Sequence, residues 1–265
     1  MANKDAIAGA QARQAQPTIR TIGTADLTNA LAKGFADFKA VPSHLIFLCV
    51  IYPVVTLIFA RAYAGYEILP VVFPLFAGFT LVGPLVMIGI YELSRRRELG
   101  LDVNLWHSFD AVRYPSIRGI FSLGIVLAAI FVAWLGAAQA IYLLIFGGVV
   151  PESVTEFARQ VLTTSAGWAL IVVGCSVGFL FAVVVLTISV VSFPMLLDRR
   201  DVGAVTAVQT SVRAVVANPI TMAKWGLIVA GALLLGALPL LVGLAVVMPV
   251  LGHATWHLYR KVVEA

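Results

Sequence analysis

Residues 220–259 read ITMAKWGLIVAGALLLGALPLLVGLAVVMPVLGHATWHLY, an apolar run whose length decides how often the chain crosses a membrane. As one helix it would be about 60 Å long, roughly twice what a hydrocarbon core of about 30 Å needs. Gly236, Pro239 and Gly243 lie near its middle, where they favour a tight turn. We therefore predict two membrane helices, 220–237 and 240–259, joined as a hairpin.

The composition places most of the chain in a bilayer. Of its 265 residues, 61% are hydrophobic and 12% are charged, whereas about a quarter are charged in an ordinary soluble domain. A soluble fold would expose large apolar patches with this composition. Besides the hairpin, the apolar runs predict four more spans, which bring the total to six: about 44–62, 68–91, 119–147 and 167–194. Pro74 and Pro84 are expected to kink the second span.

The basic residues test this span count. They gather in four segments: before the first span, between the second and third, between the fourth and fifth, and after the sixth. Six spans place all four segments on one side, whereas five would leave Arg260 and Lys261 on the other. We therefore predict a multi-pass protein with both termini cytoplasmic. The net charge of +5 follows from this topology, so no nucleic-acid partner is expected.

A pattern of four apolar residues at the helical spacing i, i+4, i+8, i+11 occurs three times, followed each time by a proline and a predicted hairpin. The three sets, called stripes here, are Leu27, Leu31, Phe35, Phe38; Leu101, Leu105, Phe109, Val112; and Ala204, Val208, Val212, Val215. They predict an all-α polytopic membrane bundle of six transmembrane helices, built as three repeats of an interfacial amphipathic helix plus a transmembrane hairpin. The expected bounds are a disordered cytoplasmic tail over 1–23 and one membrane domain over 24–265, with repeats at about 24–97, 98–200 and 201–262.

The stripes admit two interpretations. In the first, the three helices lie at the cytoplasmic membrane surface, with the stripes in the lipid boundary and Lys33, Asp37, His107 and Arg213 toward water. In the second, they are core-facing helices of a small cytoplasmic cap. Because each helix runs directly into a span, the first interpretation is favoured.

Two groups of polar residues are candidate sites. His253 and His257 are four apart, so they share a helix face, and His44 and Glu92 are expected at the same depth. Such a set could bind a metal ion or haem, or the histidines could belong to an aromatic interfacial belt. Five arginines could contact anionic headgroups, each contributing about 1 kcal/mol, although topology explains them equally well: Arg95, Arg96, Arg97, Arg199 and Arg200.

The sequence contains none of the usual signatures of enzyme chemistry, such as a Walker loop, a dinucleotide fingerprint or His-Glu-x-x-His. Acidic and basic residues are absent from the centres of the predicted spans, which disfavours proton- or cation-coupled transport. Cys49 and Cys175 both lie in apolar runs, so no disulfide framework is expected. We expect a non-enzymatic organising, assembly or lipid-interacting factor without a cofactor, whose partners are the bilayer, anionic lipids and other membrane proteins. The alternatives are a passive channel or small-solute transporter, and a metal- or haem-binding redox or assembly partner.

Four strings carry a resemblance to a known family: GPLVMIGIYELSRRRE at 83–98, FPMLLDR at 193–199, ANP at 217–219 and LGHATWHLY at 251–259. Because of these strings, the chain resembles the family of bacterial integral membrane proteins called domain of unknown function 2189. The resemblance covers about residues 20–262. The resemblance implies a multi-span protein of the bacterial inner membrane without an established activity. It supplies no catalytic residues.

Overall fold

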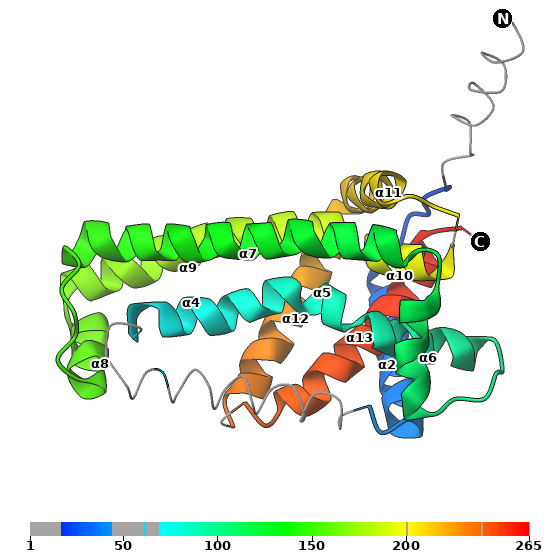
Figure 1. Ribbon diagram of the computed structural model, residues 1–265, viewed down its shortest axis with the longest axis horizontal. Helices are drawn as coiled ribbons and strands as arrows, with labels where there is room; N and C mark the ends of the chain where they lie inside the picture. The colour runs from blue at the N-terminus through cyan, green and yellow to red at the C-terminus, as the bar shows by residue number, and fades with distance from the viewer. Residues whose placement is uncertain (1–16, 44–60, 62–68, 200, 240, 265) are drawn as a thin grey trace, which may run out of the picture.

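The computed structural model describes residues 17–43, 61, 69–199, 201–239 and 241–264, most of which are helical (Figure 1). The all-α class predicted from the sequence is confirmed over these residues. In chain order the helices are α2 (Thr24–Ala40), α4 (Leu69–Phe79), η2 (Thr80–Val82), α5 (Gly83–Val86), α6 (Ile88–Glu98), η3 (Leu105–Arg113), α7 (Ile117–Phe146), α8 (Val154–Thr163), α9 (Ser165–Ser189), α10 (Ser192–Asp198), α11 (Ala204–Ala217), α12 (Pro219–Ala237) and α13 (Leu244–Val262).

Helices α7 and α9 lie side by side along the longest dimension of the molecule (Figure 1). Helix α8 connects them at one end, while α2, α6, α10 and both ends of the described chain gather at the other. Trp134 on α7 packs against Phe181 on α9 with a centroid distance of 5.7 Å. Gly178 makes room for the same indole, because a Cβ there would lie 3.0 Å from the Trp134 ring.

Three of the described helical stretches are long and apolar enough to cross a membrane: Ile117–Phe146 (α7), Ser165–Asp198 (α9 continued by α10) and Pro219–Ala237 (α12). They match the predicted third, fourth and fifth spans. Large apolar side chains such as Phe121 and Phe179 are exposed on the first two of these helices, as expected where lipid is the solvent.

The predicted second span, 68–91, is not one helix. It is divided into α4, the short 3-10 turn η2, α5 and the beginning of α6. Pro74 lies inside α4, and Pro84 lies in the first turn of α5, where its missing N–H costs no helical hydrogen bond. The expected first span lies outside the described residues except for Arg61. The six-span repeat arrangement therefore stays a prediction.

The turn predicted within residues 220–259 is confirmed, but of the two helices that it joins only Pro219–Ala237 is among the candidate spans of the described residues. That 240–259 crosses the membrane stays a prediction. Helix α12 ends at Ala237 and α13 begins at Leu244, and the two helices pack against each other. A Cβ on Gly243 would lie 2.7 Å from the carbonyl oxygen of Gly236, so the turn requires glycine at this close approach.

The three surface segments pack mainly through small or polar residues that lie beside the stripes, and α2 also packs through Leu27 of its own stripe. Helix α2 buries Leu27, Ala30, Gly34 and Asp37; η3 buries Ser108 and Ala111; α11 buries Ala207, Thr210, Ser211 and Ala214. The stripe residues Phe35, Phe109 and Val112 are exposed. By contrast, Leu27 is buried, and Leu31, Val208 and Val215 are partly buried against the core. The second segment also differs from the expected α-helix, because Leu105–Arg113 is a 3-10 helix.

Residues 17–23 differ from the disordered tail expected for 1–23. Ile19 forms an isolated antiparallel bridge with Val263, and the Glu264 N–H donates to the Thr18 carbonyl at 3.0 Å. The Ile22 N–H donates to the Asn218 side chain at 2.8 Å. These backbone groups find partners from distant parts of the chain, which periodicity within a segment cannot reveal. Residues 1–16 lie outside the described part.

Candidate functional site

The candidate site lies where α2 crosses α13, the most extensive helix–helix contact among the described residues. Gly34 allows this crossing, because a Cβ there would lie 2.6 Å from the backbone nitrogen of Ala254 and 2.8 Å from its Cα. The two backbones therefore nearly touch. Asp37 follows Gly34 by one helical turn and is carried into the contact between the helices.

Asp37 is buried, with 6% of its surface exposed, and its carboxylate has three partners. Oδ2 accepts hydrogen bonds from Ser94 Oγ at 2.7 Å and His257 Nε2 at 2.8 Å. Oδ1 lies 3.3 Å from the Arg97 Nε in an ion pair. Because a carboxylate only accepts, Nε2 of His257 carries the proton. The expectation that Asp37 faces water is wrong, since the small residues beside the stripe turn this face toward α13.

His253 extends the network into the interior. Its fully buried ring lies between two serines, with Nδ1 2.7 Å from Ser94 Oγ and Nε2 3.2 Å from Ser43 Oγ. Because Ser94 donates its proton to Asp37, Nδ1–H of His253 donates to Ser94, and Nε2 accepts from Ser43. The result is a continuous chain in which Ser43, His253 and Ser94 lead to Asp37, with His257 on the far side. We refer to these five residues as the Asp37 network.

The Asp37 carboxylate is held in its charged form by these contacts. Burial raises its pKa, but the hydrogen bonds from His257 and Ser94 are the largest of the effects that oppose burial, and the net result is a pKa below the ordinary value of 3.8. The network thus favours a negative charge at the contact between α2 and α13.

This shift predicts how stability depends on pH. Because the folded-state pKa of Asp37 is lower than the unfolded value, its contribution is complete above about pH 4 and is lost as pH falls through the folded-state pKa. We expect the wild-type Tm in detergent to drop between pH 5 and pH 3 more steeply than that of Asp37→Asn, which has no carboxylate to protonate there. Equal slopes would contradict this assignment.

A second buried cluster joins α6 to the end of η3. The fully buried Glu92 carboxylate accepts from Arg95 Nε at 2.8 Å, Arg95 Nη2 at 3.0 Å and Tyr114 Oη at 2.8 Å. The hydrogen bond to Glu92 raises the pKa of Arg95 above its ordinary value. Burial raises the pKa of Tyr114, and its bond to Glu92 raises it further. Glu92 therefore serves this cluster and is not grouped with the histidines.

The run of three arginines on α6 connects that helix to its surroundings. Arg95 contacts Tyr114, Arg96 pairs with Asp110 at 3.4 Å, and Arg97 pairs with Asp37. Arg199, farther along the chain, donates to the backbone carbonyl of Glu264, while Arg200 lies outside the described residues. Contact of these arginines with anionic headgroups stays a prediction, and each described one has an intramolecular partner.

The predicted metal or haem ligands are only partly brought together. His253 and His257 meet at Asp37, whereas His44 lies outside the described residues. Within the described ranges, no three His, Cys, Asp or Glu side chains are arranged to hold a metal ion. Both ring nitrogens of His253 and Nε2 of His257 are in hydrogen bonds, so ligation through them would first break the Asp37 network. The metal or haem hypothesis stays untested.

Sequence reasoning missed Asp37 and Ser94. The available signal was the line Ala30, Gly34 and Asp37, in which two small residues precede the carboxylate at helical spacing. Small residues of this kind mark a close helix contact. The sequence does not identify the helix that packs against these residues, so the spacing alone gives no reason to place a charged side chain inside the contact.

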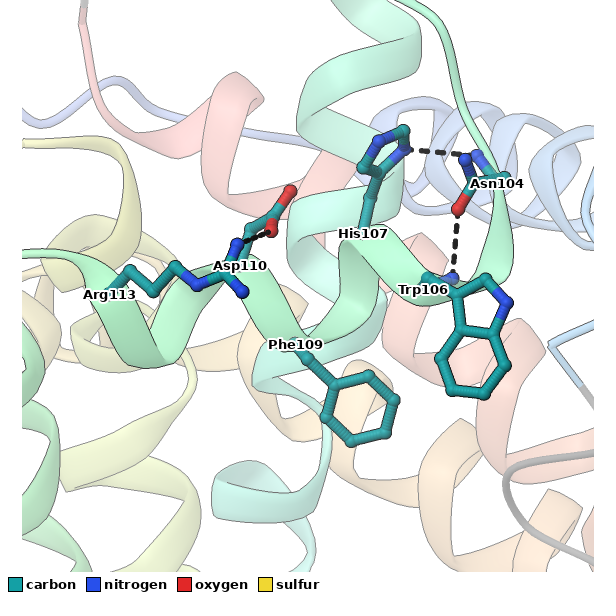
Figure 2. A pocket seen from close by; sticks show the side chains of 6 residues that line it. All are labelled: Asn104, Trp106, His107, Phe109, Asp110 and Arg113. Atoms are coloured by element: carbon teal, nitrogen blue, oxygen red, sulfur yellow. Dashed lines mark hydrogen bonds and ion pairs between the residues drawn. The ribbon is translucent and has the colours of Figure 1, made fainter.

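Outside the core, η3 presents an amphipathic surface around an open hollow of about 750 Å³ (Figure 2). Trp106 is 78% exposed and Phe109 58% exposed, with ring centroids 6.3 Å apart. Figure 2 shows both rings projecting from one side of the ribbon and His107 and Asp110 from the other. The Asn104 side chain begins the helix by accepting from the Trp106 N–H at 3.0 Å.

Comparison with known protein families gives a match to part of the chain. Residues 72–198 match the family described as "Predicted integral membrane protein (DUF2189)". This confirms the resemblance inferred from the sequence over that range, which contains α6, η3 and the two longest candidate spans. No curated protein and no solved structure matched the chain.

Proposed function

We propose that this chain, whose residues 72–198 match a family of integral membrane proteins, is a non-enzymatic lipid-interacting factor of the bacterial inner membrane. Its surface helices α2, η3 and α11 insert their apolar stripes at the boundary of the cytoplasmic leaflet. In this way the protein organises the lipids, and the membrane proteins, around its bundle.

The proposed topology has six spans with both termini cytoplasmic. Besides the distribution of basic residues, the pairing of the chain ends supports it. The Arg20 N–H donates to the Val262 carbonyl at 2.8 Å, and the side chains of Arg20 and Glu264 form an ion pair at 3.1 Å. Segments in direct contact lie on the same side of a bilayer, so the chain between them crosses it an even number of times. Six spans satisfy this condition, and five do not.

The observation that carries the lipid-interacting role is the division of each surface helix into two faces. Small residues pack against the bundle, while bulky residues beside them remain exposed, such as Phe35 on α2, Phe109 on η3 and Val205 on α11. The cap interpretation would bury the stripes, which fits Leu27 but not the exposed Phe35 and Phe109. On α11 the exposed Val205 lies next to the stripe, whose own residues are partly buried. Exposed aromatic and aliphatic side chains next to charged ones are typical of helices at a membrane interface.

A lipid-retention experiment tests this role. The double variant Phe109→Ser/Val112→Ser removes exposed apolar groups of η3, and burial of two such side chains is worth about 3 kcal/mol in total. We expect protein purified in mild detergent to retain at least about twofold less phospholipid than wild type, measured as phosphorus per protein. The neighbouring exposed variant Arg113→Ser, which leaves the stripe intact, should retain the wild-type amount. Equal retention by all three proteins would overturn the proposed role.

A further inference from the structure

A second cavity, of about 290 Å³, lies beside the Asp37 network, between the N-terminal segment, α2, α6 and the last turns of α13. Its lining carries four cationic side chains, one carboxylate and one histidine: Arg20, Lys33, Arg260, Lys261, Glu98 and His257. The residues from the N-terminal segment and α2 lie more than 200 positions before those of α13, so no local sequence motif indicates this basic cavity.

Three of the cations are positioned by carboxylates. Lys261 Nζ lies 3.6 Å from Asp26, Arg20 pairs with Glu264, and Arg260 is held at 3.1 Å by Glu98 and at 3.2 Å by Asp198. Of these carboxylates, only Glu98 lines the cavity. The acids therefore orient the cations mainly from outside the lining, and each guanidinium keeps N–H groups beyond those it uses in these pairs.

The existing pairs leave room for an anionic ligand. Both side chains of the Arg20–Glu264 pair are about half exposed, and exposed ion pairs contribute little to stability. A phosphate group forms shorter, charge-assisted hydrogen bonds and can engage a guanidinium with two of them. Exchange of the weakly bound Glu264 carboxylate for phosphate at Arg20 is therefore favourable. Lys33 has no ion pair among the described residues, so its ammonium group can pair with a ligand without losing a partner.

His257 adds a fixed group at the wall of the cavity. Its Nε2–H is held by Asp37 at 2.8 Å, which sets the orientation of the ring. Within the described part of the chain, Nδ1 has no hydrogen-bond partner. An imidazolium at this position would donate Nδ1–H to an anion in the cavity while keeping its bond to Asp37.

We propose that this cavity binds a phosphate group. The phosphate belongs to an anionic phospholipid headgroup of the cytoplasmic leaflet. This choice of a lipid as the source of the phosphate rests on the proposed lipid-interacting function. Free inorganic phosphate has the same chemistry, so the two sources are separated by experiment. Basic pockets between membrane helices on the cytoplasmic side are known headgroup sites.

The test uses the full-length protein in a non-ionic, phosphate-free detergent and measures thermal stabilisation on titration with three probes. The probes are inorganic phosphate, short-chain phosphatidylglycerol and short-chain phosphatidylcholine. The variant Lys33→Gln removes a cation from the cavity, and Lys39→Gln removes one from the same helix outside it, where Lys39 lies over the Phe35 ring. Neither substitution disturbs a described ion pair of the cavity.

We expect saturable stabilisation by phosphatidylglycerol, with Lys33→Gln weakening the apparent affinity about fivefold or more and Lys39→Gln leaving it unchanged. Stabilisation by inorganic phosphate with the same variant pattern, but none by phosphatidylglycerol, supports the phosphate site and overturns its lipid source. No saturable response to either anion, an equal response to phosphatidylcholine, or equal weakening by both variants would overturn the site. Because the stripe variants of η3 do not line this cavity, their lipid retention tests the proposed function separately.

Discussion

Replacement of Gly34 by alanine is expected to lower the free energy of unfolding by about 1–3 kcal/mol, the usual range for overpacking a well-packed core. Alanine is the better helix former by about 1 kcal/mol, so propensity alone predicts the opposite sign. The steric effect wins because the new Cβ would lie 2.6–2.8 Å from backbone and Cβ atoms of Ala254, which cannot rotate away. Helices α2 and α13 would have to separate, and the Asp37 network would separate with them.

The measurement is denaturant unfolding in detergent, followed by intrinsic tryptophan fluorescence, to which Trp256, buried on α13, contributes. Gly136→Ala on α7 is the matched control, since a Cβ there meets no atom within 4 Å and the variant should be as stable as wild type or more so. If Gly34→Ala behaves like this control, the close contact between α2 and α13 is not as described.

Asp37→Ala is expected to destabilise the protein by about 3 kcal/mol or more, which is typical for removal of one partner from a buried charged network. The substitution leaves the Ser94 hydroxyl, the His257 N–H and the Arg97 guanidinium without their shared acceptor. An unpaired buried donor costs about 1–3 kcal/mol, so the loss exceeds that of an ordinary surface carboxylate.

Asp201→Ala, which removes an exposed carboxylate, should stay within about 0.5 kcal/mol of wild type in the same unfolding assay. The double variant Asp37→Ala/His257→Ala should lose less than the sum of the two single losses, because both remove the same hydrogen bond. Strict additivity would mean that Asp37 and His257 do not interact.

Features set by local sequence were predictable. The long apolar runs located α7, α9 and α12, and the glycines and proline around Pro239 located the turn between α12 and α13. Hydropathy could not predict the division of residues 68–91, since it measures composition and not hydrogen-bond continuity. Pro74 and Pro84 indicated kinks there, but the 3-10 turn at Thr80–Val82 depends on packing against α7 and α9.

The histidines of the candidate site were predictable from local spacing, but the carboxylate that they share was not. The spacing of His253 and His257 placed them on one helix face, and the structure brings both to the same carboxylate. That carboxylate was assigned to water because its own helix carries an apolar stripe on another side. Only the contact of Gly34 with Ala254 decides that Asp37 is buried, and a contact between residues 220 positions apart has no periodic signature.

Collision measurements on nitroxide labels determine whether the exposed stripe of η3 lies in the lipid boundary. In a Cys49→Ala/Cys175→Ala background, labels are attached at Val112→Cys on the stripe of η3 and at the adjacent Arg113→Cys, both exposed positions, and the protein is reconstituted in bilayer nanodiscs. We predict that dissolved oxygen relaxes the label at 112 more strongly than a water-soluble nickel complex does, with the reverse order at 113. Preferential relaxation by the nickel complex at both positions would place the stripe in water and exclude its insertion at the lipid boundary.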